Sequence, residues 1–355
     1  MQLARQGLYT SHPNPRVGCV LVKDNKIIGE GSHIQTGKEH AEINALKQVG
    51  DHARGATCYV TLEPCVHTGK TPPCTQGLIS AGLGQVVASM VDPNPMVNGN
   101  GLIKLKEHGI NTSIGLLETE AKEINKGYVK RMSTGIPYIR CKLAISTDGK
   151  TALASGESKW ITNDQARNDV QIFRAESSAL LTGIGTILSD DPRLTVREIE
   201  LHGRIPLRVV IDRQLDIPLN AELFKHPGKV IIFTSSDKHE KISKLGDMDV
   251  DVLSPDTGVD FLSSSMKILA KEYHVNDILV EAGATLSGAL LNNHLVDEFI
   301  LYQAPIILGD KGRAMVNIGD IEKMNNKIIL KLNEIRNIGD DIRMTYQVCN
   351  SSQLK

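Results

Sequence analysis

The feature that most constrains this chain is the alternation of short apolar runs with amphipathic stretches along nearly its whole length. Short runs rich in Val and Ile predict buried strands, and apolar residues that recur every three or four positions predict helices. Strands that alternate with helices favour an α/β fold. The predicted strands span residues 17–23, 57–61, 85–91, 112–114, 138–144, 179–182, 207–211, 230–233, 278–281 and 298–304. The predicted helices span residues 40–49, 74–81, 101–108, 117–132, 164–175, 260–274 and 285–293.

A break in this alternation divides the chain into two predicted domains. With 355 residues the chain exceeds the usual length of one domain, about 100–200 residues. Residues 133–137 read Ser-Thr-Gly-Ile-Pro, after a charged helical stretch and before a new predicted strand. We therefore expect one domain over residues 1–135 and a second over residues 136–355. Aromatic residues make up only 4% of the chain, so both cores must be built mainly from Val, Ile, Leu and Ala.

Charge and cysteine content argue against several classes of protein. Residues 1–137 hold 14 Lys and Arg against 11 Asp and Glu, and the whole chain has a formal net charge of −1. This is not the basic excess of a polynucleotide-binding domain, so no nucleic-acid partner is expected. No run reaches the roughly 18 apolar residues of a membrane span, and no apolar leader opens the chain, so no membrane partner is expected. Six cysteines without disulfide spacing suggest a reducing cytoplasm.

Three separate pieces of the first half predict a zinc site. His40 stands at the start of a predicted helix, Cys65 follows a predicted strand and Pro64, and Cys74 opens another predicted helix. One His and two Cys suit tetrahedral Zn²⁺, and three protein ligands leave the fourth position to water, as in catalytic zinc sites. The positive end of a helix also favours thiolate over thiol. His-x-Glu followed by Pro-Cys and a second Cys is the zinc deaminase motif, although here eight residues rather than two separate the cysteines.

Glu42 has the position of a proton carrier for this metal. Zinc lowers the pKa of its bound water to about 7, and a carboxylate two residues from His40 can take the water's proton and return it to a leaving amine. Taken alone, a His-x-Glu pair is usually a solvated pair on a helix surface, so the prediction depends on the joint pattern. His67 is a competing ligand because it lies two residues from Cys65, but we favour it as a substrate contact. The other four cysteines are expected to be buried apolar residues.

Longer motifs make a family resemblance specific. Residues 14–18 read Asn-Pro-Arg-Val-Gly, residues 65–74 read Cys-Val-His-Thr-Gly-Lys-Thr-Pro-Pro-Cys, and residues 92–95 read Asp-Pro-Asn-Pro. In the second half, residues 186–197 read Thr-Ile-Leu-Ser-Asp-Asp-Pro-Arg-Leu-Thr-Val-Arg, and residues 280–283 read Val-Glu-Ala-Gly. With these motifs the chain resembles, over nearly its whole length, the bifunctional riboflavin biosynthesis proteins, in which a pyrimidine deaminase is fused to a reductase.

The resemblance implies a fold, two reactions and a set of partners. The fold would be a cytidine-deaminase-like α/β/α domain followed by a dihydrofolate-reductase-like α/β domain. The first domain would deaminate 2,5-diamino-6-(5-phosphoribosylamino)pyrimidin-4(3H)-one. The second would use NADPH to reduce the ribosyl group, which gives 5-amino-6-(5-phosphoribitylamino)uracil. The implied partners are this phosphorylated pyrimidine, Zn²⁺, NADPH and further copies of the chain in a homo-oligomer.

The resemblance also assigns residues in the first domain. By matching positions, the family's zinc ligands fall on His40, Cys65 and Cys74, and its proton carrier falls on Glu42. The positions that line the family's pyrimidine pocket are Asn14, His33, His67 and Lys70. An Asn can pair with a base edge, and a Lys can meet a phosphate.

In the second domain the resemblance implies a cofactor site without a dinucleotide fingerprint. There is no Gly-x-Gly-x-x-Gly, but residues 283–289 lie between a predicted strand and a predicted helix, where N–H groups can hold a pyrophosphate. The implied NADPH contacts are Ala144, Trp160, Thr186, Asp190, Gly283, Ala284, Thr285, Leu286, Ser287, Gly288 and Ala289, with Asp212 a weaker candidate. The implied substrate contacts are Lys142, Ser158, Arg174, Leu194, Arg197 and Glu281. Arg174 and Arg197 are candidates for a phosphate clamp, and Lys142 and Glu281 for assisting proton delivery.

Two departures from the family pattern and three other interpretations stay open at this point. The family usually has several residues before Leu3, which leaves a different or truncated start open, and Asn44 stands where the family often has His. A deaminase of nucleic-acid bases would need a basic groove for flanking nucleotides, which the charge count and the Cys65–Cys74 insertion disfavour. The zinc could instead be structural only, and the second half could be a non-catalytic ligand-binding module.

Overall fold

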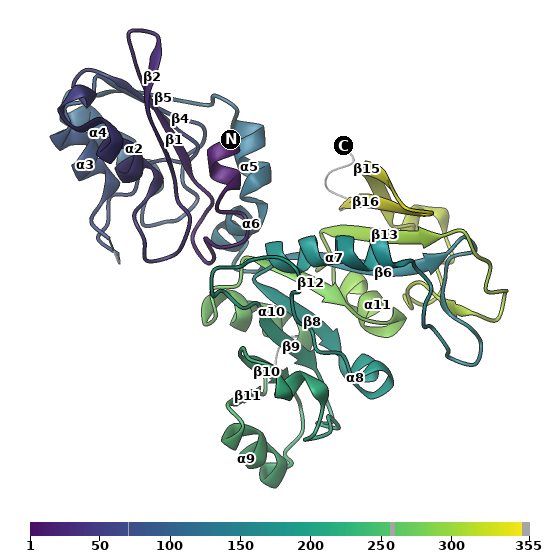
Figure 1. The fold of residues 1–355 in the computed structure, drawn as a ribbon. Coiled ribbons are helices and arrows are strands. Elements are labelled where there is room, and N and C mark those ends of the chain that lie inside the picture. The colour runs from purple at the N-terminus through teal and green to yellow at the C-terminus, as the bar shows by residue number, and fades with distance from the viewer. Residues whose placement is uncertain (70, 256–259, 350–355) are drawn as a thin grey trace. The chain divides into compact units, whose positions relative to one another are not determined.

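The structure, a computed structural model, describes residues 1–69, 71–255 and 260–349 and divides into two compact units, Met1–Ile136 and Pro137–Lys355 (Figure 1). Helix α6 (Lys126–Thr134) closes unit 1. It ends at Gly135, whose φ of 72° is a conformation that glycine adopts without steric cost. The chain then enters strand β6 of unit 2 within a few residues.

Within the described residues, unit 1 is built on a five-stranded mixed sheet. Strand β1, the second in the sheet, is antiparallel to both of its neighbours, while β3, β4 and β5 are parallel to one another. In sheet order the strands are β2 (Lys26–Ser32), β1 (Gly18–Lys23), β3 (Thr57–Val60), β4 (Gln85–Ala88) and β5 (Asn111–Ile114).

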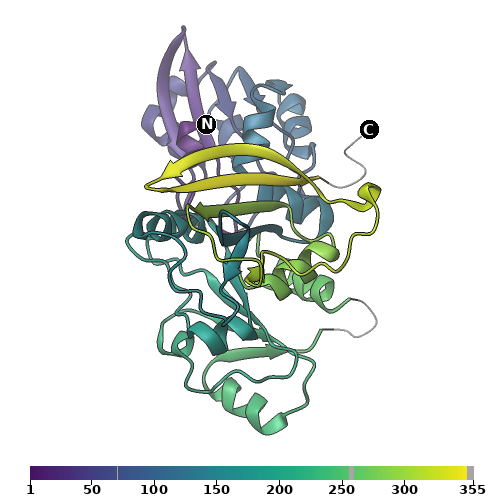
Figure 2. The ribbon, with the colours of Figure 1, turned by 90° about the vertical axis from the view of Figure 1, so that its right-hand side faces the viewer.

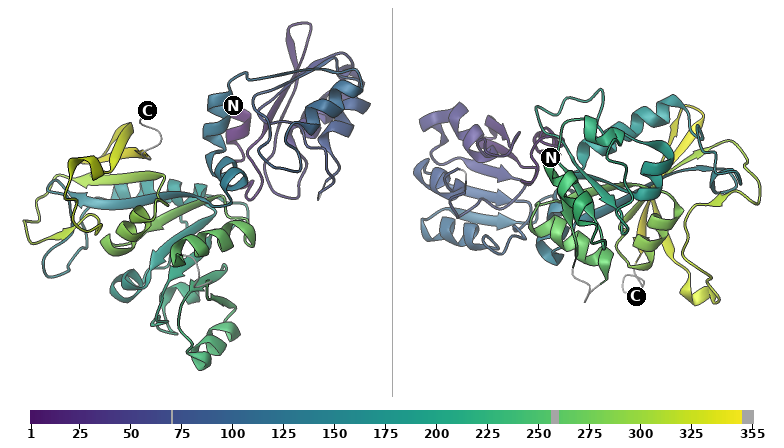
Figure 3. Two further views of the ribbon diagram at one scale, coloured as in Figure 1. Left: turned by 180° about the vertical axis from the view of Figure 1, so that it is seen from behind. Right: turned by 90° about the horizontal axis from the view of Figure 1, so that it is seen from below.

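Helices cover both faces of this sheet. Figures 1 and 3 show α2, α3 and α4 on one face and α1, α5 and α6 on the other. The core between them contains mainly Val, Leu, Ile and Ala side chains, as the low aromatic content predicts. Besides α6, the helices are α1 (Gln2–Arg5), α2 (Ala41–Val49), α3 (Cys74–Ser80), α4 (Asn100–Glu107) and α5 (Glu118–Ile124), with a 3-10 turn at Gly50–Ala53.

Two glycines in β2 bring helix α2 unusually close to the sheet. A Cβ atom at Gly31 would collide with the carbonyl oxygen of Ala41, and one at Gly29 would collide with the side chain of Val49. The helix therefore lies directly on β2. This contact fixes the place of the first turn of α2, which carries residues of the predicted metal site.

The single helix predicted over residues 117–132 is wrong, because the chain leaves the helical conformation at Asn125 (φ −112°, ψ 20°). The side chain of Asn125 accepts a hydrogen bond from the N–H of Arg16 at 2.8 Å and donates one to the carbonyl oxygen of Arg16 at 2.9 Å. Both groups are buried, so this pairing with a distant loop outweighs one more turn of helix.

Unit 2 is built, over its described part, on a nine-stranded sheet with a two-stranded ribbon beside it. The first seven strands in sheet order are parallel, and a long antiparallel hairpin, yellow in Figure 2, forms the far edge. In sheet order they are β11 (Val250–Leu253), β10 (Val230–Phe233), β9 (Leu207–Ile211), β8 (Ala179–Gly183), β12 (Asp277–Glu281), β6 (Tyr138–Ser146), β13 (Glu298–Ala304), β16 (Asp341–Cys349) and β15 (Ile329–Ile338). The ribbon pairs β7 (Lys150–Ala152) with β14 (Arg313–Ala314).

The helices of unit 2 connect the parallel strands. The first of them begins where the side chain of Asn163 accepts a hydrogen bond from the N–H of Ala166, which caps the helix. They are α7 (Asp164–Glu176), α8 (Ile184–Asp190), α9 (His239–Asp247), α10 (Phe261–Lys271) and α11 (Ala284–Asn292), with 3-10 turns at Glu222–Lys225 and Met324–Asn326. No helix in the described part of the chain is long and apolar enough to cross a membrane.

Candidate active sites

Three candidate metal ligands meet in unit 1. Nδ1 of His40, Sγ of Cys65 and Sγ of Cys74 all lie within 4.8 Å of one another. Nδ1 of His40 is 3.0 Å from Sγ of Cys74 and 3.6 Å from Sγ of Cys65. Nitrogen and sulfur ligands at about 2.0–2.3 Å from a tetrahedral zinc ion lie about 3.5 Å apart. The three donor atoms thus have both the chemistry and nearly the separations that zinc requires.

Each of these ligands is held by the end of a regular element. His40 is the N-cap of α2, and Cys74 is the first residue of α3, after a proline whose fixed φ suits a helix start. Cys65 lies in the loop after β3. Helix α3 also holds Cys65, because the N–H and the hydroxyl of Thr75 both donate to its carbonyl oxygen, each at 3.2 Å.

The surroundings of the two thiols favour a thiolate. A hydrogen bond from the Cys74 thiol lowers the pKa of Cys65 to about 4, and His40 and the N–H of Cys74 add to this effect. The N–H of Cys74 lies 3.3 Å from Sγ of Cys65. The pKa of Cys74 is raised, because its thiol is the donor in this pair and because it is buried. A metal ion that replaced the shared proton would stabilise both sulfurs as thiolates.

Glu42 lies beside these ligands in the first turn of α2, and its side chain is buried. Burial raises the pKa of its carboxyl, the negative charge of Cys65 raises it further, and His40 opposes both. A carboxyl group whose pKa is raised toward neutral can both accept and release a proton during a reaction.

Hydrogen bonds orient Asn14 near the same site. Nδ1 of His33 lies 3.0 Å from the carbonyl oxygen of Glu39, so Nδ1 must carry the donated proton. Nε2 of His33 is then an acceptor, and Nδ2 of Asn14 donates to it at 3.1 Å. Burial lowers the pKa of His33, which favours this neutral form. The ring of His33 also packs edge-to-face on His40, with 5.1 Å between the ring centroids.

Three further residues that the sequence analysis singled out in this domain are His67, Lys70 and Asn44. His67 is not one of the three grouped ligand residues, and its Nδ1 is buried without a hydrogen-bond partner among the described residues. Lys70 lies outside the described residues. Asn44 donates from Nδ2 to the carbonyl oxygens of Ser32 at 2.9 Å and Glu39 at 3.4 Å, so it ties the end of β2 to the start of α2.

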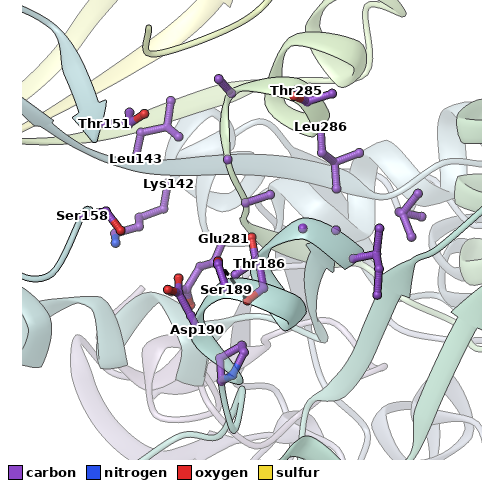
Figure 4. A pocket seen from close by; sticks show the side chains of 18 of the residues that line it. Lys142, Leu143, Thr151, Ser158, Thr186, Ser189, Asp190, Glu281, Thr285 and Leu286 are labelled. Atoms are coloured by element: carbon purple, nitrogen blue, oxygen red, sulfur yellow. Dashed lines mark hydrogen bonds between the residues drawn. The ribbon is translucent and has the colours of Figure 1, made fainter. Parts of the chain in front are cut away.

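A large cleft opens at the carboxyl ends of the parallel strands of unit 2. Its walls come from β6, β9 and β12 and from α7, α8 and α11, and Figure 4 shows side chains from several of these elements around it. Ligands of open α/β sheets bind at this edge. The cleft encloses about 1810 Å³, which exceeds the roughly 300–1,000 Å³ typical of a pocket for one small ligand. It therefore has room for a dinucleotide and a second molecule.

Three charged side chains meet inside the cleft. Nε and Nη2 of Arg174 donate to the two carboxylate oxygens of Glu281 at 2.5 and 3.0 Å, and these side chains are only 14% and 15% exposed. Nη1 of Arg174 donates to the carbonyl oxygen of Thr195 at 2.8 Å. Burial lowers the pKa of the Lys142 amine; Glu281 partly offsets this shift, and Arg174 adds to it. Arg174 is thus already engaged on both edges of its guanidinium, whereas Arg197 is exposed.

Most of the expected NADPH and substrate contacts line this one cleft. They are Lys142, Ala144, Ser158, Trp160, Arg174, Thr186, Asp190, Leu194, Arg197, Asp212, Glu281, Gly283, Ala284, Thr285, Leu286 and Ala289. Two expected contacts do not line it: Ser287 is fully buried, and Gly288 packs against the backbone of Asn317. Helical geometry explains the difference, because residues 285, 286 and 289 share one side of α11.

The cleft also contains residues that no sequence motif indicated. Arg167 places its guanidinium carbon 4.3 Å from the centroid of the Trp160 ring, and Gln171 accepts a hydrogen bond from the N–H of Arg197 at 3.0 Å. The only available signal was spacing, since Arg167, Gln171 and Arg174 recur at three- or four-residue intervals on α7. Asn317 lines the cleft from a segment without regular structure and had no such signal.

Comparison with known proteins places this combination of sites in one family. The family model described as the RibD C-terminal domain matches residues 137–344, which is more than half of the chain. The model of the cytidine and deoxycytidylate deaminase zinc-binding region matches residues 1–90. The riboflavin biosynthesis protein RibD of Escherichia coli is 47% identical over 354 residues, which cover 96% of this chain and 95% of that protein. The chain belongs to the RibD family.

Solved structures agree with membership of the RibD family. Acinetobacter baumannii RibD is 45% identical with a TM-score of 0.91, and the match covers 98% of this chain and 96% of that one. A protein of Thermotoga maritima, described as a diaminohydroxyphosphoribosylaminopyrimidine deaminase/5-amino-6-(5-phosphoribosylamino)uracil reductase, is 34% identical with a TM-score of 0.85, over the same shares of the two chains. These matches confirm the predicted fold class and the predicted bifunctional RibD family.

Proposed function

We propose that this chain catalyses two successive reactions of riboflavin biosynthesis, with deamination in unit 1 and reduction in unit 2. Unit 1 replaces the 2-amino group of 2,5-diamino-6-(5-phosphoribosylamino)pyrimidin-4(3H)-one by oxygen from water and releases ammonia. Unit 2 reduces the ribosyl group of the product to a ribityl group with NADPH. The observation that carries the proposal is the convergence of His40, Cys65 and Cys74 beside the buried carboxyl of Glu42, in a chain of the RibD family.

In the deaminase, His40, Cys65 and Cys74 hold the zinc ion and Glu42 moves protons. Bound zinc supplies a Lewis acid that activates the attacking water. The carboxylate of Glu42 accepts one proton from that water and delivers it to the departing amine, so Glu42 ends the cycle in the form in which it began. Its raised pKa suits this exchange.

Asn14 and His33 orient the pyrimidine. Because Asn14 donates its amide hydrogen to His33, its Oδ1 remains the group that could accept a hydrogen bond from a ligand. Such an acceptor recognises an N–H on the edge of a pyrimidine and does not favour a ring nitrogen that lacks hydrogen. The buried Nδ1 of His67, which has no partner among the described residues, suits a further contact to the substrate.

In the reductase, the Lys142 ammonium is the proton donor next to the sugar, and Glu281 assists it as an ionised carboxylate. Burial raises the pKa of Glu281, but its ion pair with Arg174 outweighs this and keeps the pKa below the usual range. Bound NADPH would supply the hydride that reduces the sugar carbon bearing the amine. The proton for the ring oxygen released from that carbon would come from Lys142. Burial makes the Lys142 ammonium a better proton donor than an exposed lysine. Arg174 fixes the carboxylate of Glu281, which leaves the exposed Arg197 as the stronger candidate to bind the 5′-phosphate.

The test uses the full, metal-loaded chain and the diaminopyrimidinone phosphate. We expect one ammonia per substrate without NADPH, and oxidation of one NADPH once the deaminated pyrimidine is present, followed by absorbance at the nicotinamide band. A metal-loaded chain that releases no ammonia would contradict the deaminase half. A chain that leaves NADPH unoxidised with deaminated substrate would make the second half a binding module.

We further propose a cytoplasmic location and a homo-oligomeric state. All six cysteines are free, which suits a reducing compartment. Cell fractionation and the mass of the purified chain in solution would test these two points. A secreted protein or a monomer at cellular concentration would contradict them.

A further inference from the structure

A buried carboxylate in unit 1 has no part in the mechanism above. Glu63 lies on the loop that follows β3, and the residue is only 3% exposed. Its Oε2 accepts hydrogen bonds from the N–H groups of Asp92 at 3.1 Å and Gly99 at 2.9 Å. Its Oε1 accepts from the N–H groups of Gly101 at 2.7 Å and Leu102 at 3.3 Å. Within the described residues this carboxylate has these backbone donors and no ion pair.

Two of these donors belong to the first turn of α4. A helix leaves its first N–H groups without partners inside the helix, and the side chain of the N-cap residue usually supplies an acceptor. The N-cap of α4 is Gly99, which has no side chain and a φ of 91°. Glu63 supplies the missing acceptor from a distant part of the sequence, and its negative charge suits the positive end of the helix.

The same helix turn lies in direct contact with the loop that carries Glu63. A Cβ atom at Gly101 would collide with the carbonyl oxygen of Pro64 and would lie 2.9 Å from Oε1 of Glu63. On the sheet side, the N–H of Glu63 donates to the carbonyl oxygen of Met90 at 3.0 Å. The two residues before Cys65 are therefore fixed by α4 on one side and by the extension of β4 on the other.

Cys65 itself is fixed on its carboxyl side by α3, through the two hydrogen bonds from Thr75. Glu63 therefore affects only the backbone on the amino-terminal side of Cys65. We propose that Glu63 is a positioning residue, which fixes the backbone before Cys65 so that its sulfur meets the metal together with His40 and Cys74. This inference rests on the zinc site of the proposed function.

The substitution Glu63→Gln tests this role in the full chain. Gln keeps the length of the side chain but turns one acceptor oxygen into an NH₂ group, which then faces backbone N–H donors. We expect the dissociation constant for Co²⁺, measured by titration of the metal-free chain, to rise at least tenfold. The visible band of Co²⁺ bound to two sulfurs should weaken as well. Reduction of the deaminated substrate by NADPH should stay within twofold of wild type.

Val86→Ala is the matched control for general instability. Val86 is fully buried in the core of unit 1 near the start of β4 and makes none of the hydrogen bonds of Glu63. Its truncation should therefore lower the unfolding temperature of this unit while the contacts of Glu63 remain. We expect Co²⁺ binding within twofold of wild type in this variant. Equal Co²⁺ binding by Glu63→Gln and Val86→Ala would overturn the role of Glu63. A wild-type chain that binds no Co²⁺ would instead overturn the zinc site itself, and this inference with it.

A second variant decides the matter if Glu63→Gln does not fold. Gly101→Ala leaves the carboxylate intact but forces α4 away from Pro64 and Glu63. We expect the same loss of Co²⁺ affinity, at least tenfold, with reductase activity retained. Unchanged Co²⁺ affinity in Gly101→Ala would show that this contact does not position Cys65.

Discussion

At the scale of the residue, a substitution at Glu42 can distinguish metal binding from proton transfer. Gln at this position has the same size and cannot carry a proton, so Glu42→Gln should keep its zinc and lose ammonia release by about 10²- to 10⁴-fold. Zinc content and ammonia are measured on one preparation. Glu118→Gln, which removes an exposed carboxylate from α5, is the control and should change neither quantity. Loss of zinc together with activity in Glu42→Gln would mean that Glu42 has a structural role.

The lowered pKa of Lys142 leads to a prediction of how the rate of the reductase reaction changes with pH. Its ammonium donates a proton only below its pKa, which burial lowers from the usual range of lysine. The rate of reduction should therefore decline at high pH with a midpoint below that of an exposed lysine. In Lys142→Arg, whose guanidinium stays protonated, this decline should disappear and the maximal rate should fall. A pH profile of NADPH oxidation that is the same in both proteins would exclude Lys142 as the donor.

The sequence indicated the residues with distinctive chemistry and missed those that position them. His40, Glu42, Cys65 and Cys74 could be found because zinc chemistry restricts both the residue types and the order in which they occur. Nothing in the sequence showed that Glu281 occupies the guanidinium of Arg174. Such pairings join residues far apart in the chain, so they follow from the fold and from no local spacing.

At the scale of the element, helix α11 and the segment around Asn317 form one wall of the reductase cleft. The N–H of Asn317 donates to the carbonyl oxygen of Ala284 at 3.0 Å, and Gly288 leaves room for this segment. Gly288→Ala should displace it, lower the free energy of unfolding by about 1–3 kcal/mol and raise the KM for NADPH. Thermal unfolding and NADPH kinetics measure both effects.

Gly246→Ala provides the comparison for this prediction. Gly246 lies in helix α9, and an added Cβ there meets no atom within 4 Å. Ala should raise the free energy of unfolding by about 0.4–1 kcal/mol through its higher helix propensity, with the KM for NADPH unchanged. Similar behaviour of the two variants would show that the contact with Asn317 has no effect on the cleft.

Three of the strands that the sequence did not predict, β2, β15 and β16, share a physical reason. Strand β2 contains Gly29 and Gly31, which weaken the strand pattern, yet α2 lies so close that only glycine fits. The hairpin of β15 and β16 is largely exposed along β15, so its alternation of apolar and polar residues is weak. In both cases tertiary contacts, and not local preference, decide the conformation.

At the scale of the whole molecule, the two units hold separate chemistry and should respond separately to loss of metal. Removal of zinc by a chelator should abolish ammonia release and leave NADPH oxidation with deaminated substrate within twofold of its original rate. Added zinc should restore ammonia release. If chelation abolished both ammonia release and NADPH oxidation, the claim that zinc serves only the deaminase reaction of unit 1 would be wrong.

The central claim is that His40, Cys65 and Cys74 hold a catalytic zinc ion, and the coordination of that ion tests it most directly. X-ray absorption at the zinc edge of the purified full chain should show one metal per chain, with two sulfur atoms at about 2.3 Å and nitrogen or oxygen atoms at about 2.0–2.1 Å. This is the shell formed by Cys65, Cys74, His40 and a water molecule. A shell without sulfur, or a chain that releases ammonia while free of metal, would contradict the account.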